Sequence, residues 1–164
     1  MIILVADTSV LIDLERGNLL QRTLAGPDTI ATPDLLYARE LAEYNGPELL
    51  QLGLQVLELT AEELSAVQAL HVGSPKLSVP DCAAYIGALR EDHVLLAGDG
   101  LLRQHAAVTN VDRHGVLWLL DRLLANGAAN RAELFAGLML ITSHPRCRLS
   151  PDEVQIRLDA WRDE

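Results

Sequence analysis

The chain has 164 residues, of which 49% are hydrophobic, and its formal net charge is −10. This length and composition suffice for one domain with a hydrophobic core and exclude a disordered chain, and no apolar run is long enough to span a membrane. The negative charge argues against a protein that holds nucleic acid by general electrostatic attraction. A local arginine patch or a basic partner protein could still supply phosphate contacts.

The first apolar run and the cysteines indicate the compartment. The amino-terminal run is short, lacks a basic flank and ends in Asp7, so we do not interpret it as a signal peptide. Cys82 and Cys147 are far apart in the sequence and do not have metal-ligand spacing. We therefore expect a cytoplasmic protein with reduced thiols.

Strand and helix patterns alternate along the chain. Short apolar runs predict strands at residues 2–6, 29–31, 54–59, 93–97 and 108–111. Capping residues and apolar periodicity predict helices at residues 10–14, 19–25, 32–44, 60–71, 78–91, 101–106, 115–124, 131–142 and 151–161. Alternating strands and helices form a parallel sheet with right-handed crossovers. We expect one α/β domain over residues 1–164, with residues 127–164 as a helical C-terminal extension.

Three helix starts have clear capping signals. Thr8 or Ser9 is expected to cap the first helix. Thr32 is expected to cap a helix with Pro33 at its first position, and Asn45-Gly46-Pro47 is expected to end that helix. Further along, Thr60-Ala61-Glu62-Glu63 has the capping-box pattern.

Four acidic residues stand at element boundaries. Asp7 and Asp99 each follow a buried strand directly, Asp81 begins a helix, and Glu40 lies on the helix after a short strand. If the first and fourth strands are neighbours, Asp7 and Asp99 lie at the carboxyl edge of the sheet, where α/β proteins bind ligands. Taken singly, each acid also has a structural interpretation: a helix cap, a first-turn acid, a solvated helix residue or a turn residue.

Together, these acids have a chemical requirement. Two like charges at about 4 Å repel by roughly 4 kcal/mol in a partly shielded site, so clustered carboxylates take up protons or bind a cation. Oxygen ligands select hard ions such as Mg²⁺ or Mn²⁺, and such ions support phosphodiester cleavage.

The four segments around these acids resemble the PIN-domain ribonucleases, and among them the VapC-like toxins of toxin–antitoxin pairs. The matching segments are ILVADTSVLIDL with Asp7, PDLLYAREL with Glu40, SVPDCAAYIGAL with Asp81 and VLLAGDGLL with Asp99. The resemblance covers residues 2–125. It implies a three-layer α/β/α sandwich around a parallel sheet, here with extra C-terminal helices, and Mg²⁺- or Mn²⁺-dependent cleavage of RNA. It also implies a homodimer and an antitoxin partner.

The resemblance assigns roles to these residues. Asp7, Asp81 and Asp99 are the expected metal ligands, and Glu40 is a further ligand or orients the attacking water. Many relatives have Thr or Ser two positions before the fourth acid, where this chain has Ala97.

Several other polar residues are weaker candidates. Ser9 is expected to bind an acid or a phosphate, or simply to cap the helix. Arg39, Arg103 and Lys76 are candidates for RNA phosphate, although surface solvation is the simpler interpretation of each one alone. Among the histidines, only His105 is close enough to Asp99 in sequence to be tested. For Asp13 we favour a solvated helix face, although it could approach the site.

Two functions from different classes fit this sequence. The first is a metal-dependent ribonuclease that forms the toxin half of a type II toxin–antitoxin pair. The alternative is a weakly active or inactive PIN-like module that binds RNA or protein. Ala97 and the net acidity keep this alternative open, whereas the intact Asp7, Glu40, Asp81 and Asp99 argue against it. A nucleotide-binding Rossmann-type protein is disfavoured because the chain lacks a GxGxxG motif and a P-loop.

Overall fold

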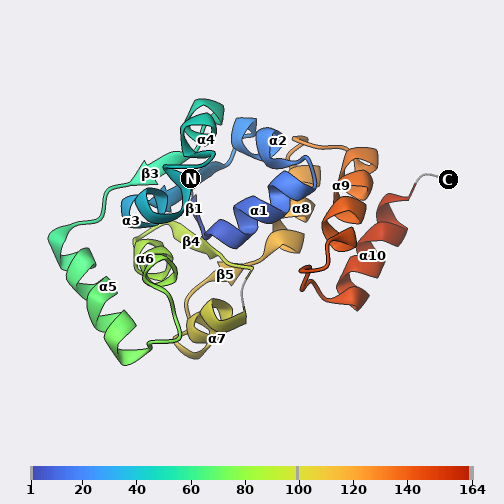
Figure 1. Ribbon diagram of the computed structural model, residues 1–164. Coiled ribbons are helices and arrows are strands. Elements are labelled where there is room, and N and C mark those ends of the chain that lie inside the picture. The colour runs from blue at the N-terminus through green and yellow to red at the C-terminus, as the bar shows by residue number, and fades with distance from the viewer. Residues whose placement is uncertain (1, 99, 163–164) are drawn as a thin grey trace.

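The computed structural model describes residues 2–98 and 100–162. These residues form a five-stranded sheet in the order β3-β2-β1-β4-β5, and every strand pairing is parallel (Figure 1). The strands are β1 (Ile3–Ala6), β2 (Thr29–Pro33), β3 (Gln55–Leu57), β4 (His93–Leu96) and β5 (Arg113–His114). The predicted α/β class with a parallel sheet is confirmed, and the first and fourth strands are neighbours as expected.

Helices cover both faces of this sheet. They are α1 (Thr8–Arg16), α2 (Leu20–Ala25), α3 (Asp34–Leu36), the π-helix η1 (Tyr37–Leu41), α4 (Gly46–Leu52), α5 (Ala61–Gly73), α6 (Val79–Ala88), α7 (Gly100–Val108), α8 (Val116–Ala125), α9 (Arg131–Ser143) and α10 (Pro151–Trp161). Helix α6 packs against β1, β2 and β4, and α5 packs against α6. On the other side α9 packs against α1 and α8, and α10 packs against α9 (Figure 1). The arrangement is the three-layer α/β/α sandwich with extra C-terminal helices.

The central strand is buried on both faces because its side chains are apolar without interruption. Leu4, Val5 and Ala6 are fully buried. Small residues let α6 approach this strand closely: a Cβ at Gly87 would lie only 3.8 Å from Cγ1 of Val5 and 3.5 Å from Cγ of Pro33. This packing places the start of α1, directly after β1, at the carboxyl edge of the sheet.

The second strand is longer than the sequence predicts. Residues Thr29–Pro33 all belong to β2, so Thr32 is a strand residue and not a helix cap. The Thr32 side chain is fully buried, and its hydroxyl makes no hydrogen bond within the part of the chain that the structure describes. Pairing of Thr32 and Pro33 with β3 extends the strand to the point where α3 begins at Asp34.

The helix expected over residues 32–44 is divided. Helix α3 continues into η1, and a turn then leads to α4, which the sequence analysis did not predict. Pro47 lies in the first turn of α4, a position that tolerates proline because its missing N–H would have no partner there. Proline therefore begins a helix here, where we expected it to end one. Tyr44, in the turn between η1 and α4, is 79% exposed.

The predicted strand over residues 108–111 is wrong. Val108 is the last residue of α7, and Asn110 adopts a positive φ of 60° in the turn that follows. The fifth strand instead forms at Arg113–His114, where it pairs with Leu95 and Leu96. The helices expected near residues 115–124, 131–142 and 151–161 are present as α8, α9 and α10.

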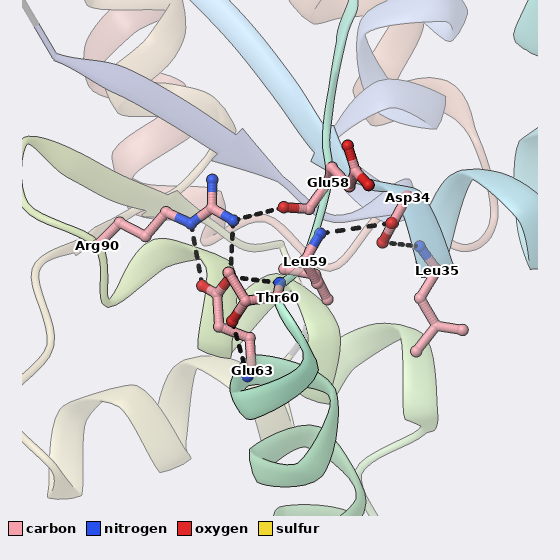
Figure 2. Close-up of polar contacts among 7 residues, drawn as sticks. All are labelled: Asp34, Leu35, Glu58, Leu59, Thr60, Glu63 and Arg90. Carbon is pink, nitrogen blue, oxygen red and sulfur yellow. Dashed lines mark hydrogen bonds and ion pairs between the residues drawn. The ribbon is translucent and has the colours of Figure 1, made fainter.

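A polar cluster around Arg90 joins the loop after β3 to the end of α6 (Figure 2). The Arg90 guanidinium donates from Nε and Nη2 to the two carboxylate oxygens of Glu63 at 2.9 and 2.7 Å, and from Nη2 to the Glu58 carbonyl at 2.7 Å. Glu63 also forms the predicted capping box with Thr60. Asp34 accepts from the backbone N–H of Leu35 (2.8 Å) and of Leu59 (3.4 Å). We call Asp34, Glu58, Thr60, Glu63 and Arg90 the Arg90 cluster.

No helix in the described part of the chain is long and apolar enough to cross a membrane.

Candidate active site at the carboxyl edge of the sheet

Asp7 lies at the carboxyl end of β1 and is only 2% exposed. Its backbone N–H donates to the Leu96 carbonyl at 3.0 Å, which places it beside the end of β4. Its Oδ1 accepts from the Ser9 hydroxyl at 2.7 Å and from the Val10 N–H at 3.1 Å. Asp7 itself therefore caps α1, and the expectation that Thr8 or Ser9 is the cap is wrong. The two hydrogen bonds fix the orientation of a buried carboxylate at the edge of the sheet where α/β proteins bind ligands.

Glu40 is joined to the same edge through Thr8. The Thr8 hydroxyl donates to Glu40 Oε1 at 2.9 Å, which connects residues 32 positions apart in the sequence. Glu40 lies within the π-helix η1 and is half-buried. Single π-turns within helices are rare overall, and many of those that occur lie at functional sites. This one follows α3 without a break and places Glu40 next to the residue that follows Asp7.

Asp81 lies in the first turn of α6, and its backbone N–H donates to Ser78 Oγ at 3.1 Å. Ser78 is thus the cap of α6, and α6 packs against β1 and β4, the strands that end beside Asp7. The fourth predicted acid, Asp99, lies outside the described residues. Its neighbour Gly98 is described, and a Cβ at Gly98 would lie 2.9 Å from the Ser9 hydroxyl.

A cleft of about 550 Å³ opens beside Ser9 and Gly98. One wall is α1, and the other is the loop between α9 and α10, which reaches back toward α1 in Figure 1. The lining residues are Ser9, Ile12, Asp13, Arg16, Gly98, Pro145, Arg146, Cys147, Arg148 and Leu149. We call this cavity the arginine cleft. Ser9 belongs to the cleft and also bonds to Asp7, so the two features are continuous.

Asp13 faces this cleft, although the sequence favoured a solvated position for it. Its side chain is 17% exposed, and a Cβ at Gly98 would lie 3.9 Å from its Oδ2. Burial raises the pKa of Asp13, while the charges of Arg16 and His144 lower it by less. The nearest Arg16 nitrogen is 3.7 Å from Asp13 Oδ1, too long for a hydrogen bond. Asp13 is therefore a partly buried acid with only loose charge compensation.

The other basic candidates lie outside the arginine cleft. Arg39 is exposed on η1, and Lys76 is exposed in the loop before α6. Arg103 on α7 lies against Gly115: a Cβ there would be 2.8 Å from Arg103 Nη1 and 3.7 Å from the Ala97 carbonyl. Arg103 is thus close to the end of β4, and Arg39 is adjacent in sequence to Glu40.

His105 and Ala97 both pack against other parts of the fold. The His105 ring packs edge-to-face against Tyr85 with the centroids 4.8 Å apart. Ala97 is fully buried directly after β4. Because this residue is alanine, the position offers no hydroxyl.

Sequence analysis missed Arg16, Arg146 and Arg148, three side chains that face one cleft. The available signal was the short segment His144–Leu149, which has two arginines between two predicted helices. Nothing in the sequence placed that loop against α1.

The donor set of the predicted metal site has the right chemistry, because every proposed ligand is a carboxylate oxygen. Among residues 2–98 and 100–162, however, no group of three or more His, Cys, Asp or Glu side chains could hold a metal ion. The predicted metal site also includes Asp99, which lies outside the described residues.

The sequence matches the family DUF3368, described as a PIN domain, over residues 3–162. The match covers nearly the whole chain, including α9 and α10, so the protein belongs to this PIN-domain family. PIN domains are generally nucleases, and those nucleases typically use divalent metal ions. No curated protein matches the sequence.

Proposed function

We propose that the protein is a metal-dependent endoribonuclease that hydrolyses RNA phosphodiester bonds. The observation that supports this most strongly is Asp7, a carboxylate 2% exposed and oriented by two hydrogen bonds at the carboxyl edge of a PIN-domain sheet. A buried carboxylate is costly unless it is compensated by donors or a cation. Buried ionisable groups are therefore concentrated at functional sites, where the charge takes part in binding or catalysis.

Each acid then has a role. Asp7, Asp81 and Asp99 would hold Mg²⁺ or Mn²⁺, and Ser9 would keep the Asp7 carboxylate in place through its 2.7 Å hydrogen bond. A bound divalent ion supplies charge neutralisation at the phosphate and activation of water in such sites. Glu40, held by Thr8 at 2.9 Å, would orient the attacking water and accept its proton. Arg39 and Arg103 would bind RNA phosphates at the rim.

The first experiment is cleavage of a mixed, structured RNA pool by the wild type and by Asp7→Asn, with Mg²⁺, with Mn²⁺ and with EDTA. We expect ion-dependent cleavage by the wild type and a loss of at least about a hundredfold in Asp7→Asn, the scale typical for removal of a catalytic group. Asp159→Asn on the exposed face of α10 is the matched control and should cleave normally. Equal cleavage by Asp7→Asn would contradict the proposal.

The toxin role is a narrower part of the same proposal. It predicts that expression of the wild type arrests growth, that Asp7→Asn does not, and that co-expression of an antitoxin encoded next to this gene restores growth. The proposed homodimer is tested by the mass of the protein in solution. Growth that is equal for wild type and Asp7→Asn would leave a ribonuclease without a toxin role.

A binding module without strong catalysis is the second candidate. The buried Ala97 favours it, because this position lacks the hydroxyl that many PIN relatives have beside the fourth acid. RNA that is bound but not cleaved by the folded wild type, with either ion, would favour this module over the enzyme.

A further inference from the structure

We propose that the arginine cleft is the backbone-binding subsite of this protein, in which Arg146 and Arg148 bind phosphates of a single-stranded RNA next to the scissile one. The inference rests on the proposed function, because it takes RNA as the substrate. It assigns to the α9–α10 loop a direct role in holding that substrate.

The loop that presents these arginines is held by hydrogen bonds and by packing. The His144 N–H donates to the Ile141 carbonyl at 3.3 Å, and the Cys147 N–H donates to the His144 carbonyl at 3.0 Å. Within the loop, the Arg146 N–H donates to His144 Nδ1 at 3.1 Å. Cys147 and Leu149 pack against the hydrophobic core. The backbone positions of Arg146 and Arg148 are therefore set by packing before any ligand arrives.

The charges in the cleft are available to a ligand. Arg146 and Arg148 are exposed, and no carboxylate of the described residues lies within ion-pair distance of either one. Arg16 contributes a third guanidinium, only loosely paired with Asp13 at 3.7 Å. In a chain with a net charge of −10, three arginines around one cavity are a local reversal of charge. Guanidinium groups match the geometry of phosphate oxygens.

The position of the cleft identifies the part of the RNA that it would hold. Ser9 lines the cleft and donates to Asp7, so the cavity begins one hydrogen bond away from the proposed catalytic carboxylate. If the scissile phosphate of an RNA strand lies at Asp7, the neighbouring phosphates of that strand would lie beside Arg146 and Arg148 in the arginine cleft. None of the cleft's lining residues is aromatic, so bases lack a ring on which to stack. The cleft therefore fits the backbone better than the bases, and its contribution should depend little on sequence.

The test measures RNA binding separately from cleavage. All variants carry Asp7→Asn, and the assay contains EDTA, so the RNA stays intact. We expect Arg146→Ala/Arg148→Ala to bind a single-stranded RNA about tenfold more weakly than the parent, to a similar degree for different sequences. The slope of log Kd against log salt should fall by about 1.4, or about 0.7 for each lost phosphate contact.

The charge-matched control is Arg131→Ala/Arg162→Ala. These residues lie at the start of α9 and just after α10, the ends of the two helices that are distant from the loop (Figure 1). This variant also loses two positive charges, so it reports the effect of net charge alone. Its affinity and salt slope should stay close to those of the parent.

Cys147 offers a readout that needs no arginine variant. It lies in the cleft and is half-buried, whereas Cys82 is fully buried. A thiol reagent should therefore modify Cys147 first. RNA at about ten times its Kd should slow this modification by about tenfold.

The outcomes separate the two proposals. If the wild type cleaves RNA but the loop variant keeps the parent's affinity and salt slope, or RNA leaves Cys147 unprotected, the subsite is refuted and the ribonuclease stands. If the wild type neither binds nor cleaves RNA, the proposed function fails and the subsite fails with it. A third outcome is that Arg146→Ala/Arg148→Ala binds a polyglutamate peptide more weakly than the parent does but binds RNA equally well. This outcome would overturn the subsite in favour of an acidic protein partner.

Discussion

The Arg90 cluster and the arginine cleft use the same kinds of side chain in opposite ways. In the Arg90 cluster the guanidinium makes three hydrogen bonds of 2.7–2.9 Å, two of them to one carboxylate (Figure 2). Among the described residues that line the arginine cleft, the only ion pair, between Arg16 and Asp13, is 3.7 Å long. The first region is a closed network, and the second presents its charges to a cavity of about 550 Å³.

The pKa values of two acids show the electrostatic consequence of this difference. The hydrogen bonds from Arg90 lower the pKa of Glu63 to about 2, an effect that its partial burial opposes. Burial raises the pKa of Asp13, and the charges of Arg16 and His144 offset this rise only in part. A bidentate arginine therefore stabilises the fold, whereas an arginine without a close partner remains able to bind an external anion.

The largest effect on stability is expected from Arg90→Ala. It removes two of the hydrogen bonds to Glu63, which keeps the one from the Thr60 N–H, and the hydrogen bond to the Glu58 carbonyl. We expect a loss of about 2–3 kcal/mol in the free energy of unfolding. For a chain of this size the melting temperature should fall by roughly 5–10 °C. Thermal and urea denaturation would measure both quantities.

Arg148→Ala is the matched control for this prediction. Its side chain is exposed and faces the cleft, so stability should change by no more than about 0.5 kcal/mol. If both substitutions destabilise the protein equally, the contrast between the closed network and the open cleft is wrong.

A smaller effect should appear at low pH. The folded-state pKa of Glu63 is about 2, below its ordinary value of 4.5, so the unfolded state binds this proton more tightly. The stabilisation is present in full above about pH 5 and is lost progressively as the pH falls toward about 2. Replacing Glu63 by Gln should reduce the acid sensitivity of unfolding over this range. Identical pH profiles for the two proteins would show that Arg90 does not favour the charged form of Glu63.

The sequence predicted what depends on local patterns. The buried run Ile3–Ala6 identified the central strand, and the Thr60 capping box identified the start of α5. The same local information placed Asp7 at the carboxyl edge of the sheet. These features were predictable because their causes, apolar continuity and side-chain capping, lie within a few residues of each other.

Features set by tertiary pairing were not predictable in this way. Thr32-Pro33 has the composition of a helix start, but pairing with β3 keeps both residues in the strand. The fifth strand is only two residues long and exists because β4 offers it a partner. The arginine cleft depends on the packing of α9 against α1, two helices far apart in the sequence, so no local pattern indicated that Arg146 and Arg148 lie beside α1.

The smallest expected effect distinguishes the acid of the cleft from its arginines. If the arginine cleft binds phosphate, the negative charge of Asp13 opposes that binding, because it lies on the same cavity wall as Arg16. In the Asp7→Asn background with EDTA, Asp13→Asn should therefore bind RNA about two- to threefold more tightly, the size of one partly screened like-charge repulsion. This change has the opposite sign to that of Arg146→Ala/Arg148→Ala. Asp159→Asn removes the same charge from the exposed face of α10 and should leave the affinity unchanged. Weaker binding by Asp13→Asn would mean that this acid holds Arg16 in a productive position, so that even the loose 3.7 Å pair contributes to the structure of the cleft.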